Sequence, residues 1–126
     1  MPALEPVLSM RVVASRDALD TARWTGDDVD VVRIAPDEAL ALGATEVAID
    51  DPDAIVEPES GFSVALLDAD DLRRAQEHVE WELPRTRGVL SQGKIAGVPA
   101  KLVTGEPAVL IVQTAFADEL RGRLGW

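Results

Sequence analysis

Apolar residues recur along the chain in short runs separated by turn residues, a pattern that predicts several strands and few helices. Residues 7–14 and 29–35 favour strands, with a loop at Asp27, Asp28 and Asp30 before the second, and residues 61–67 predict a buried strand. Short strands are expected at 45–50 and 54–57, on either side of a turn at 51–53. The apolar segments 93–103 and 108–113 flank the turn Thr-Gly-Glu-Pro and are expected to form a hairpin.

Four segments carry helix signals. Residues 16–23 predict a short helical turn. Residues 36–38 favour a helix start, because proline fits the first turn and carboxylates favour the positive end of the helix dipole; Gly43 would end this helix. Residues 69–83 predict the longest helix, capped by Asp68 and stopped by Pro84, and residues 115–124 predict a closing helix. The apolar positions of the longest one are Leu72, Ala75, Val79 and Leu83.

These elements together predict an α+β fold with two layers. We expect a mostly antiparallel sheet of five to seven strands, with two or three helices packed on it. The chain has 126 residues, without internal repeats or a long linker, so residues 1–126 are expected to form a single domain. Apolar residues make up 47% and are mostly aliphatic, which predicts an aliphatic core.

The charge of the chain narrows the classes of partner. Its 23 Asp and Glu outnumber its 12 Lys and Arg, for a formal net charge of -11. Such a surface repels nucleic acid and acidic membranes, so neither is an expected partner. Residues 1–9 lack a leader pattern and no apolar stretch could span a membrane, so a cytoplasmic protein is expected. The abundance of Arg, Ala, Val and Asp is typical of bacteria with GC-rich genomes.

Candidate catalytic residues are few, and they form no self-sufficient catalytic set. The chain has no cysteine, which excludes thiolate catalysis, iron-sulfur clusters and disulfides. His78 is the only histidine, and on a helix it would share a face with Glu82 as two ligands of a divalent cation. The alternative is a solvent-exposed histidine on a charged helix. No metal site and no cofactor are therefore assigned.

The acidic stretch 50–59 offers oxygen ligands of the kind that calcium and magnesium prefer. It lacks the spacing of an EF-hand loop, and the alternative is a solvated loop. If the protein were an enzyme using carboxylates and a bound metal, its only candidate residues would be this stretch, His78 and Glu82. The carboxylates of the stretch are Asp50, Asp51, Asp53, Glu57 and Glu59.

The segment 85–101 runs against the overall charge, since it contains four cations and no acid. Such a segment could hold a small anionic ligand or an acidic partner face. The alternative is pairing with the protein's own carboxylates. The candidate ligand-binding residues are Arg85, Arg87, Lys94 and Lys101.

The three tryptophans, Trp24, Trp81 and Trp126, are candidate interface residues, because aromatic anchors dominate protein interfaces. The alternative for each is partial burial at the edge of the core. An interaction module would show a grouped patch of exposed apolar residues. Its occupant would be a protein partner or a second copy of the chain.

Two stretches resemble a known family. Residues 31–43, VVRIAPDEALALG, and residues 88–102 followed by the helix Phe-Ala-Asp-Glu-Leu at 116–120 are similar to the gamma subunit of heterotetrameric sarcosine oxidase. They also resemble the related folate-binding domain of aminomethyltransferases. The resemblance covers residues 29–126 and implies that residues 39–42 form a strand rather than a helix. It also implies an accessory subunit that packs beside flavin- and folate-handling chains without supplying catalytic residues.

Three functions follow as hypotheses. The first is a non-catalytic accessory subunit or protein-interaction domain. The alternative is a domain that binds a small anionic, folate-like ligand, and the third is the carboxylate- and metal-dependent enzyme.

Overall fold

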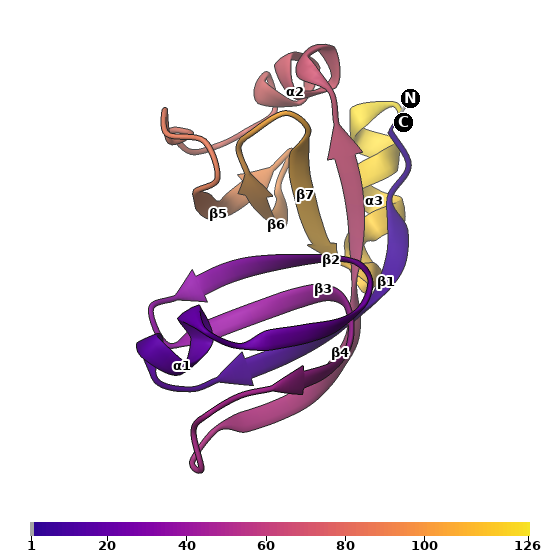
Figure 1. Ribbon diagram of the computed structural model, residues 1–126. Coiled ribbons are helices and arrows are strands. Elements are labelled where there is room, and N and C mark those ends of the chain that lie inside the picture. The colour runs from indigo at the N-terminus through magenta and orange to yellow at the C-terminus, as the bar shows by residue number, and fades with distance from the viewer. Residues whose placement is uncertain (1) are drawn as a thin grey trace. The chain divides into compact units, whose positions relative to one another are not determined.

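The computed structural model describes residues 2–126, which form an α+β fold of one seven-stranded antiparallel sheet and three helices (Figure 1). The strands lie in the order β2-β3-β1-β4-β7-β6-β5. The predicted fold class is thereby confirmed. The elements are β1 (Glu5–Val13), α1 (Arg16–Asp20), β2 (Arg23–Ala35), β3 (Glu38–Ala48), β4 (Ile55–Leu67), α2 (Ala69–Gln76), β5 (Leu90–Ile95), β6 (Val98–Val103), β7 (Ala108–Gln113) and α3 (Thr114–Leu124).

Tertiary contacts divide the described chain into two compact units. The terminal unit comprises residues 2–6 and 61–126, and the central unit comprises residues 7–60. Strand β4 runs through both, with its first half in the central unit and its second half in the terminal unit. The expectation of a single domain over residues 1–126 stays a prediction.

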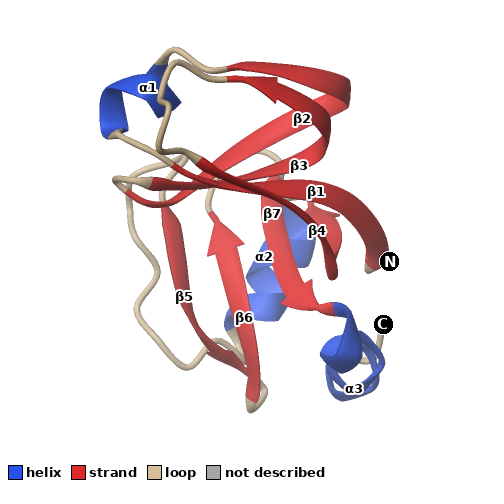
Figure 2. Cartoon of the chain, turned by 90° about the horizontal axis from the view of Figure 1, so that it is seen from below, coloured by secondary structure: helices blue, strands red, loops and turns tan. Residues whose placement is uncertain are grey.

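The terminal unit buries an aliphatic core between its strands and its two helices. Alternate residues of β4, β6 and β7 point into this core, as the period of a strand requires. Ala75 brings α2 onto the core, and Leu120, which is fully buried, does the same for α3. Figure 2 shows both helices of this unit with the strands β5, β6 and β7. Burial of these side chains is the main force that holds the unit together.

The central unit has a smaller core beneath α1. Val12 of β1 and Ala39 of β3 are fully buried there, against Ala18 and Leu19 of the helix. Ser15 caps α1, because its Oγ accepts a hydrogen bond from the N–H of Ala18 at 3.2 Å. A five-residue helix has little stability of its own, so this core and its cap hold it in place.

The helix expected to begin at residues 36–38 and to end at Gly43 is wrong. Pro36 and Asp37 form the tight turn between β2 and β3, and residues 39–42 lie in the first half of β3. Strand β3 pairs with β2 along one edge and with β1 along the other, and residues 39–42 are all buried. A continuous apolar run does not distinguish such a strand from a buried helix. The strand that the family resemblance implied at 39–42 is present.

The longest predicted helix is confirmed at its start and wrong at its end. Asp68 caps α2 by accepting the N–H of Asp71 at 2.8 Å, but the helix stops at Gln76 instead of residue 83. Val79 instead forms a bridge with Ile95 of β5, and the N–H of Glu80 donates to the carbonyl of Lys94 at 2.9 Å. Strand β5 is an edge strand, and its unpaired backbone groups bind this segment in place of a further helical turn.

The expected strand 93–103 is two strands, β5 and β6, joined by a turn at Ala96 and Gly97. Both residues have positive φ angles, 48° and 80°, which is the geometry of a two-residue hairpin turn. Alanine rarely adopts it, and the side chain of Arg123 stabilises the turn by donating to the carbonyl of Ala96 at 2.6 Å. The expected hairpin between β6 and β7 is confirmed.

Asp27, Asp28 and Asp30, which were expected to mark a loop, lie within β2 instead. The strand carries an irregular bulge between Gly26 and Asp30, where its register against β3 shifts. The predictions of a strand at 7–14 and of the closing helix at 115–124 are confirmed within one or two residues, and the strand predicted at 61–67 is the second part of β4, which begins earlier, at Ile55. In the described part of the chain, no helix is both long enough and apolar enough to cross a membrane.

Candidate functional site

The four cations of segment 85–101 do not gather at one place. Arg85 and Arg87 line a cavity of about 380 Å³ beside α2. Lys101 lines a different cavity of about 230 Å³, where its Nζ donates to Oε1 of Gln92 at 3.0 Å. Lys94 is exposed on the edge strand β5. A ligand held by all four side chains is therefore not what this geometry favours.

The three tryptophans lie half-buried at the edges of the two cores. Trp81 and Trp126 pack against the core of the terminal unit, and Trp24 packs against that of the central unit. Trp81 lies against the backbone of Gly93, so closely that a Cβ at residue 93 would be 2.6 Å from its ring. Each tryptophan therefore lies where the alternative interpretation expected it, partly buried at the edge of a core. A role in an interface stays a prediction.

The candidate metal ligands are dispersed. His78 follows the end of α2, so His78 and Glu82 do not share a helix face as expected. Among residues 2–126, no group of three or more His, Asp or Glu side chains is placed to hold a metal ion. His78 instead lines a cavity of about 240 Å³ with Arg74, Glu77 and Trp126.

A strip of apolar residues crosses β1, β2 and β3 of the central unit beside α1. Val31 of β2 pairs with Ala41 of β3, and Ala41 pairs in turn with Met10 of β1, so the three side chains share one row and one face. Leu8 lies two residues before Met10 on the same face of β1. We call these four residues, together with Pro58 of β4, which lines the same hollow as Leu8 and Met10, the Leu8 strip.

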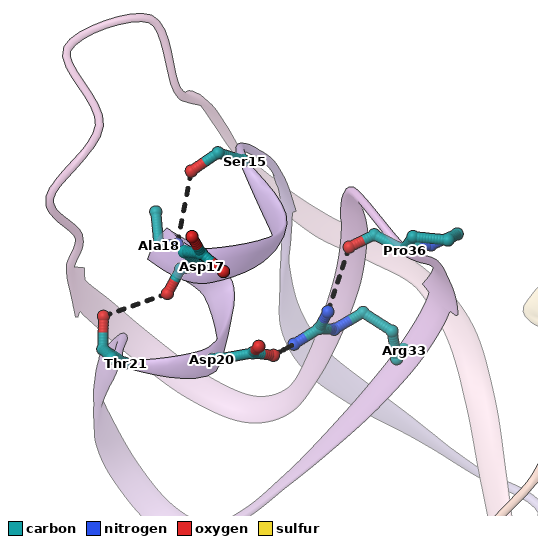
Figure 3. Close-up of polar contacts among 7 residues, drawn as sticks. All are labelled: Ser15, Asp17, Ala18, Asp20, Thr21, Arg33 and Pro36. Atoms are coloured by element: carbon teal, nitrogen blue, oxygen red, sulfur yellow. Dashed lines mark hydrogen bonds and ion pairs between the residues drawn. The ribbon is translucent and has the colours of Figure 1, made fainter.

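The strip lies on the same face as α1, which covers only the next row of residues. Val12, Ala39 and Arg33 form that row, and Val12 packs under the helix. Figure 3 shows Arg33 reaching from β2 to α1: its Nη2 donates to Oδ1 of Asp20 at 2.6 Å, and its Nη1 donates to the carbonyl of Pro36 at 3.0 Å. Arg33 thus ties α1 to β2 at the row next to the strip.

Leu8 and Val31 of the strip are unusually exposed for apolar residues, whereas Ala41 beside them is buried. Leu8 is 70% exposed and Val31 is 41% exposed. Leu8, Met10 and Pro58 also line a hollow of about 350 Å³, whose other lining residues come from β1, β3 and β4. Grouped exposure of this kind marks an interaction surface more often than scattered apolar residues do.

The negative charge of the protein is concentrated in the unit that carries this strip. The central unit, residues 7–60, carries 13 Asp and Glu against 4 Arg, a formal net charge of -9, whereas the terminal unit carries 10 against 8, a net charge of -2. Two of the four arginines pair within the unit: Arg11 with Glu38 at 3.0 Å and with Glu57 at 3.5 Å, and Arg33 with Asp20. The hydrogen bond and charge of Glu38 raise the pKa of Arg11.

Asp51 fixes the start of α1 from across the central unit. Its Oδ2 accepts the N–H of Ser15 at 2.8 Å, and its Oδ1 accepts the N–H of Asp53 at 2.9 Å. These two backbone hydrogen bonds lower the pKa of Asp51 below its usual 3.8. The acidic stretch 50–59 therefore has a structural role at this position.

The pH dependence of stability tests this role of Asp51. Because its pKa is lower in the folded chain than in the unfolded one, Asp51 stabilises the fold fully above 3.8, and this contribution is lost as the pH falls through its lowered pKa. Asp51→Asn is expected to lower the thermal midpoint at pH 7, and the difference from the unmodified chain should shrink toward pH 3. Thermal melts by circular dichroism between pH 3 and 7 measure it. Asp50→Asn, at an exposed neighbouring carboxylate, should change the midpoint much less, and an equal effect would contradict the assignment.

Comparison with known proteins does not identify this chain. No known protein family and no curated protein matches this chain.

Sequence reasoning missed the Leu8 strip because the strip depends on strand register. Leu8 and Val31 are 23 positions apart and become neighbours only through their shared partners on β1 and β3. The only signal in the sequence was apolar residues at alternate positions of strand 7–14, which predicts one apolar face but not whether that face is covered.

Proposed function

We propose that this chain is a non-catalytic protein-interaction domain, and that the Leu8 strip binds a basic partner protein. The observation that carries the proposal is the Leu8 strip beside α1, in which Leu8 is 70% exposed and Val31 is 41% exposed. Apolar anchors at the centre of a contact supply most of the affinity of an interface.

The negative charge of the central unit determines which kind of partner the strip would bind. A net charge of -9 on the central unit attracts a surface rich in Lys and Arg and repels a second copy of the same face. The occupant is therefore a different protein, with an apolar centre and a basic rim. The resemblance to the gamma subunit of sarcosine oxidase gives flavin- and folate-handling chains as the first partners to test.

The decisive variant places a positive charge at the centre of the strip. Leu8→Arg should leave the stability of the chain nearly unchanged, because the side chain is mostly exposed. Against a basic partner it removes an apolar anchor and adds like-charge repulsion, so affinity should fall at least about tenfold, or about 1.4 kcal/mol. Leu66→Arg is the matched control, since Leu66 is 60% exposed but lies in the terminal unit.

The measurement begins with affinity purification of the tagged chain from its native host at low salt, and mass spectrometry of proteins that co-elute in stoichiometric amount. The co-eluting protein is then purified, and its affinity for the three forms of the chain is measured by calorimetry at two salt concentrations. We expect a basic partner whose binding weakens with salt and with Leu8→Arg, but not with Leu66→Arg. An acidic partner, binding indifferent to Leu8→Arg, self-association alone, or no stoichiometric partner would each contradict the proposal.

A further inference from the structure

The cavity lined by Arg85 and Arg87 is a second feature of interest, and it lies wholly within the terminal unit. Its volume of about 380 Å³ falls in the range of small-molecule sites. Leu72 and Gln76 of α2 form one wall, and Leu83, Pro84 and the two arginines form another. The turn before β7, with Thr104, Gly105 and Glu106, completes the lining.

The loop that carries the arginines is held in place. The N–H of Gly88 donates to the carbonyl of Thr104 at 2.7 Å, and Oγ1 of Thr104 donates to the carbonyl of Thr86 at 2.9 Å. On the other side, Trp81 and Leu83 pack against the core. Both walls of the cavity are thus positioned before any ligand arrives, which lowers the entropic cost of binding.

The charges of the cavity leave positive charge in excess. The lining contains two arginines and one carboxylate, Glu106, whose Oε1 lies 3.5 Å from Nη2 of Arg87. Both members of this pair are largely exposed, so the pair is weak and Arg87 can exchange Glu106 for another anion. A positive cavity stands out in a chain with a net charge of -11.

The lining of the same cavity also has an apolar part. Leu72, Leu83 and Pro84 are half-buried and offer a surface to a hydrocarbon group. A bare inorganic anion would leave this surface unused. The lining therefore has two chemical halves, cationic and apolar, within the dimensions of a single small molecule.

The geometry points to a binding site for a small carboxylate with an apolar body. The guanidinium groups of Arg85 and Arg87 hold the carboxylate, since their planar forks match its two oxygens. Leu72, Leu83 and Pro84 take the apolar body. Glu106 occupies Arg87 while the site is free and competes with the ligand for it.

Phenylacetate is the probe that tests the site, with acetate and inorganic phosphate as comparisons. Amide shifts of the isotope-labelled chain are followed by NMR during titration at low salt. We expect saturable shifts that centre on residues 72–88 and 104–106, and tighter binding of phenylacetate than of acetate or phosphate. If the amide shifts did not saturate by about 20 mM phenylacetate, the affinity would be too low for a specific site, and the inference would be overturned.

Two double variants with the same change in charge separate a site from general electrostatic attraction. Arg85→Gln with Arg87→Gln should weaken phenylacetate binding at least about tenfold, whereas Lys94→Gln with Lys101→Gln should leave it within about twofold. Glu106→Gln should strengthen it, because Arg87 loses its competitor. Equal weakening by both double variants, or weaker binding with Glu106→Gln, would overturn the inference. Each variant's thermal midpoint, measured alongside, verifies that the fold is retained.

Discussion

Leu120→Ala is expected to lower the free energy of unfolding by about 2–5 kcal/mol. Leu120 is fully buried where α3 packs on the strands of the terminal unit. Truncation removes apolar contacts and leaves a cavity that rigid strands on one side and a helix on the other cannot fully close. Urea unfolding, followed by circular dichroism and by tryptophan fluorescence, measures the change.

Leu66→Ala provides the comparison for this prediction. Leu66 is 60% exposed, so the same loss of side-chain atoms removes little buried surface and should cost less than about 1 kcal/mol. Trp81 and Trp126 pack against the same core as Leu120, so their fluorescence should report the loss of packing. If Leu120→Ala and Leu66→Ala proved equally mild, α3 would not contribute to the core as described.

Local signals in the sequence were enough for the elements whose determinants are local. Asp68 predicted the start of α2 because a capping side chain acts on backbone groups only three residues away. The closing helix was predicted from its own apolar spacing, and Leu120 lies on the face that it buries. The α+β class followed from the order of such elements rather than from any single one.

The errors arose where distant pairing overrides local preference. Residues 39–42 form a strand because β1 and β2 bind them from both sides, and the segment after Gln76 leaves the helix because the edge of β5 binds it. Although β2 is adjacent in sequence, Met10 of β1 and its partner Ala41 are 31 positions apart, and β5 begins only at Leu90. A helix-like pattern and a doubly buried strand therefore cannot be separated without knowledge of the sheet.

The candidate sites were predictable in chemistry but not in arrangement. The excess of cations in segment 85–101 was visible in the sequence, yet only Arg85 and Arg87 share a cavity. Lys101 lies on β6 and serves a different surface. Likewise, the acidity of the chain was plain, but its concentration in residues 7–60 becomes meaningful only when the compact units are known.

The bulge in β2 gives the second prediction of large effect. Gly26→Ala is expected to lower the free energy of unfolding by about 1–3 kcal/mol, because a Cβ at residue 26 would lie 2.1 Å from the carbonyl oxygen of Gly43. That oxygen belongs to the backbone of β3 and cannot turn aside as a flexible side chain could. Gly26 also has a φ of 156°, at the margin of the range that alanine seldom adopts.

The same substitution in α3 should have the opposite sign. Gly122 lies within the helix, and no atom outside its immediate surroundings lies within 4 Å of the position its Cβ would take. Gly122→Ala should raise the free energy of unfolding by about 0.5–1 kcal/mol, because alanine loses less backbone entropy in a helix. Urea unfolding of both variants measures the two changes in the free energy of unfolding. If both variants were destabilised, backbone contact at Gly26 would not be the cause of its loss of stability. Opposite signs would establish that the bulge beside the acidic residues of β2 depends on close approach of two backbones, which only glycine permits.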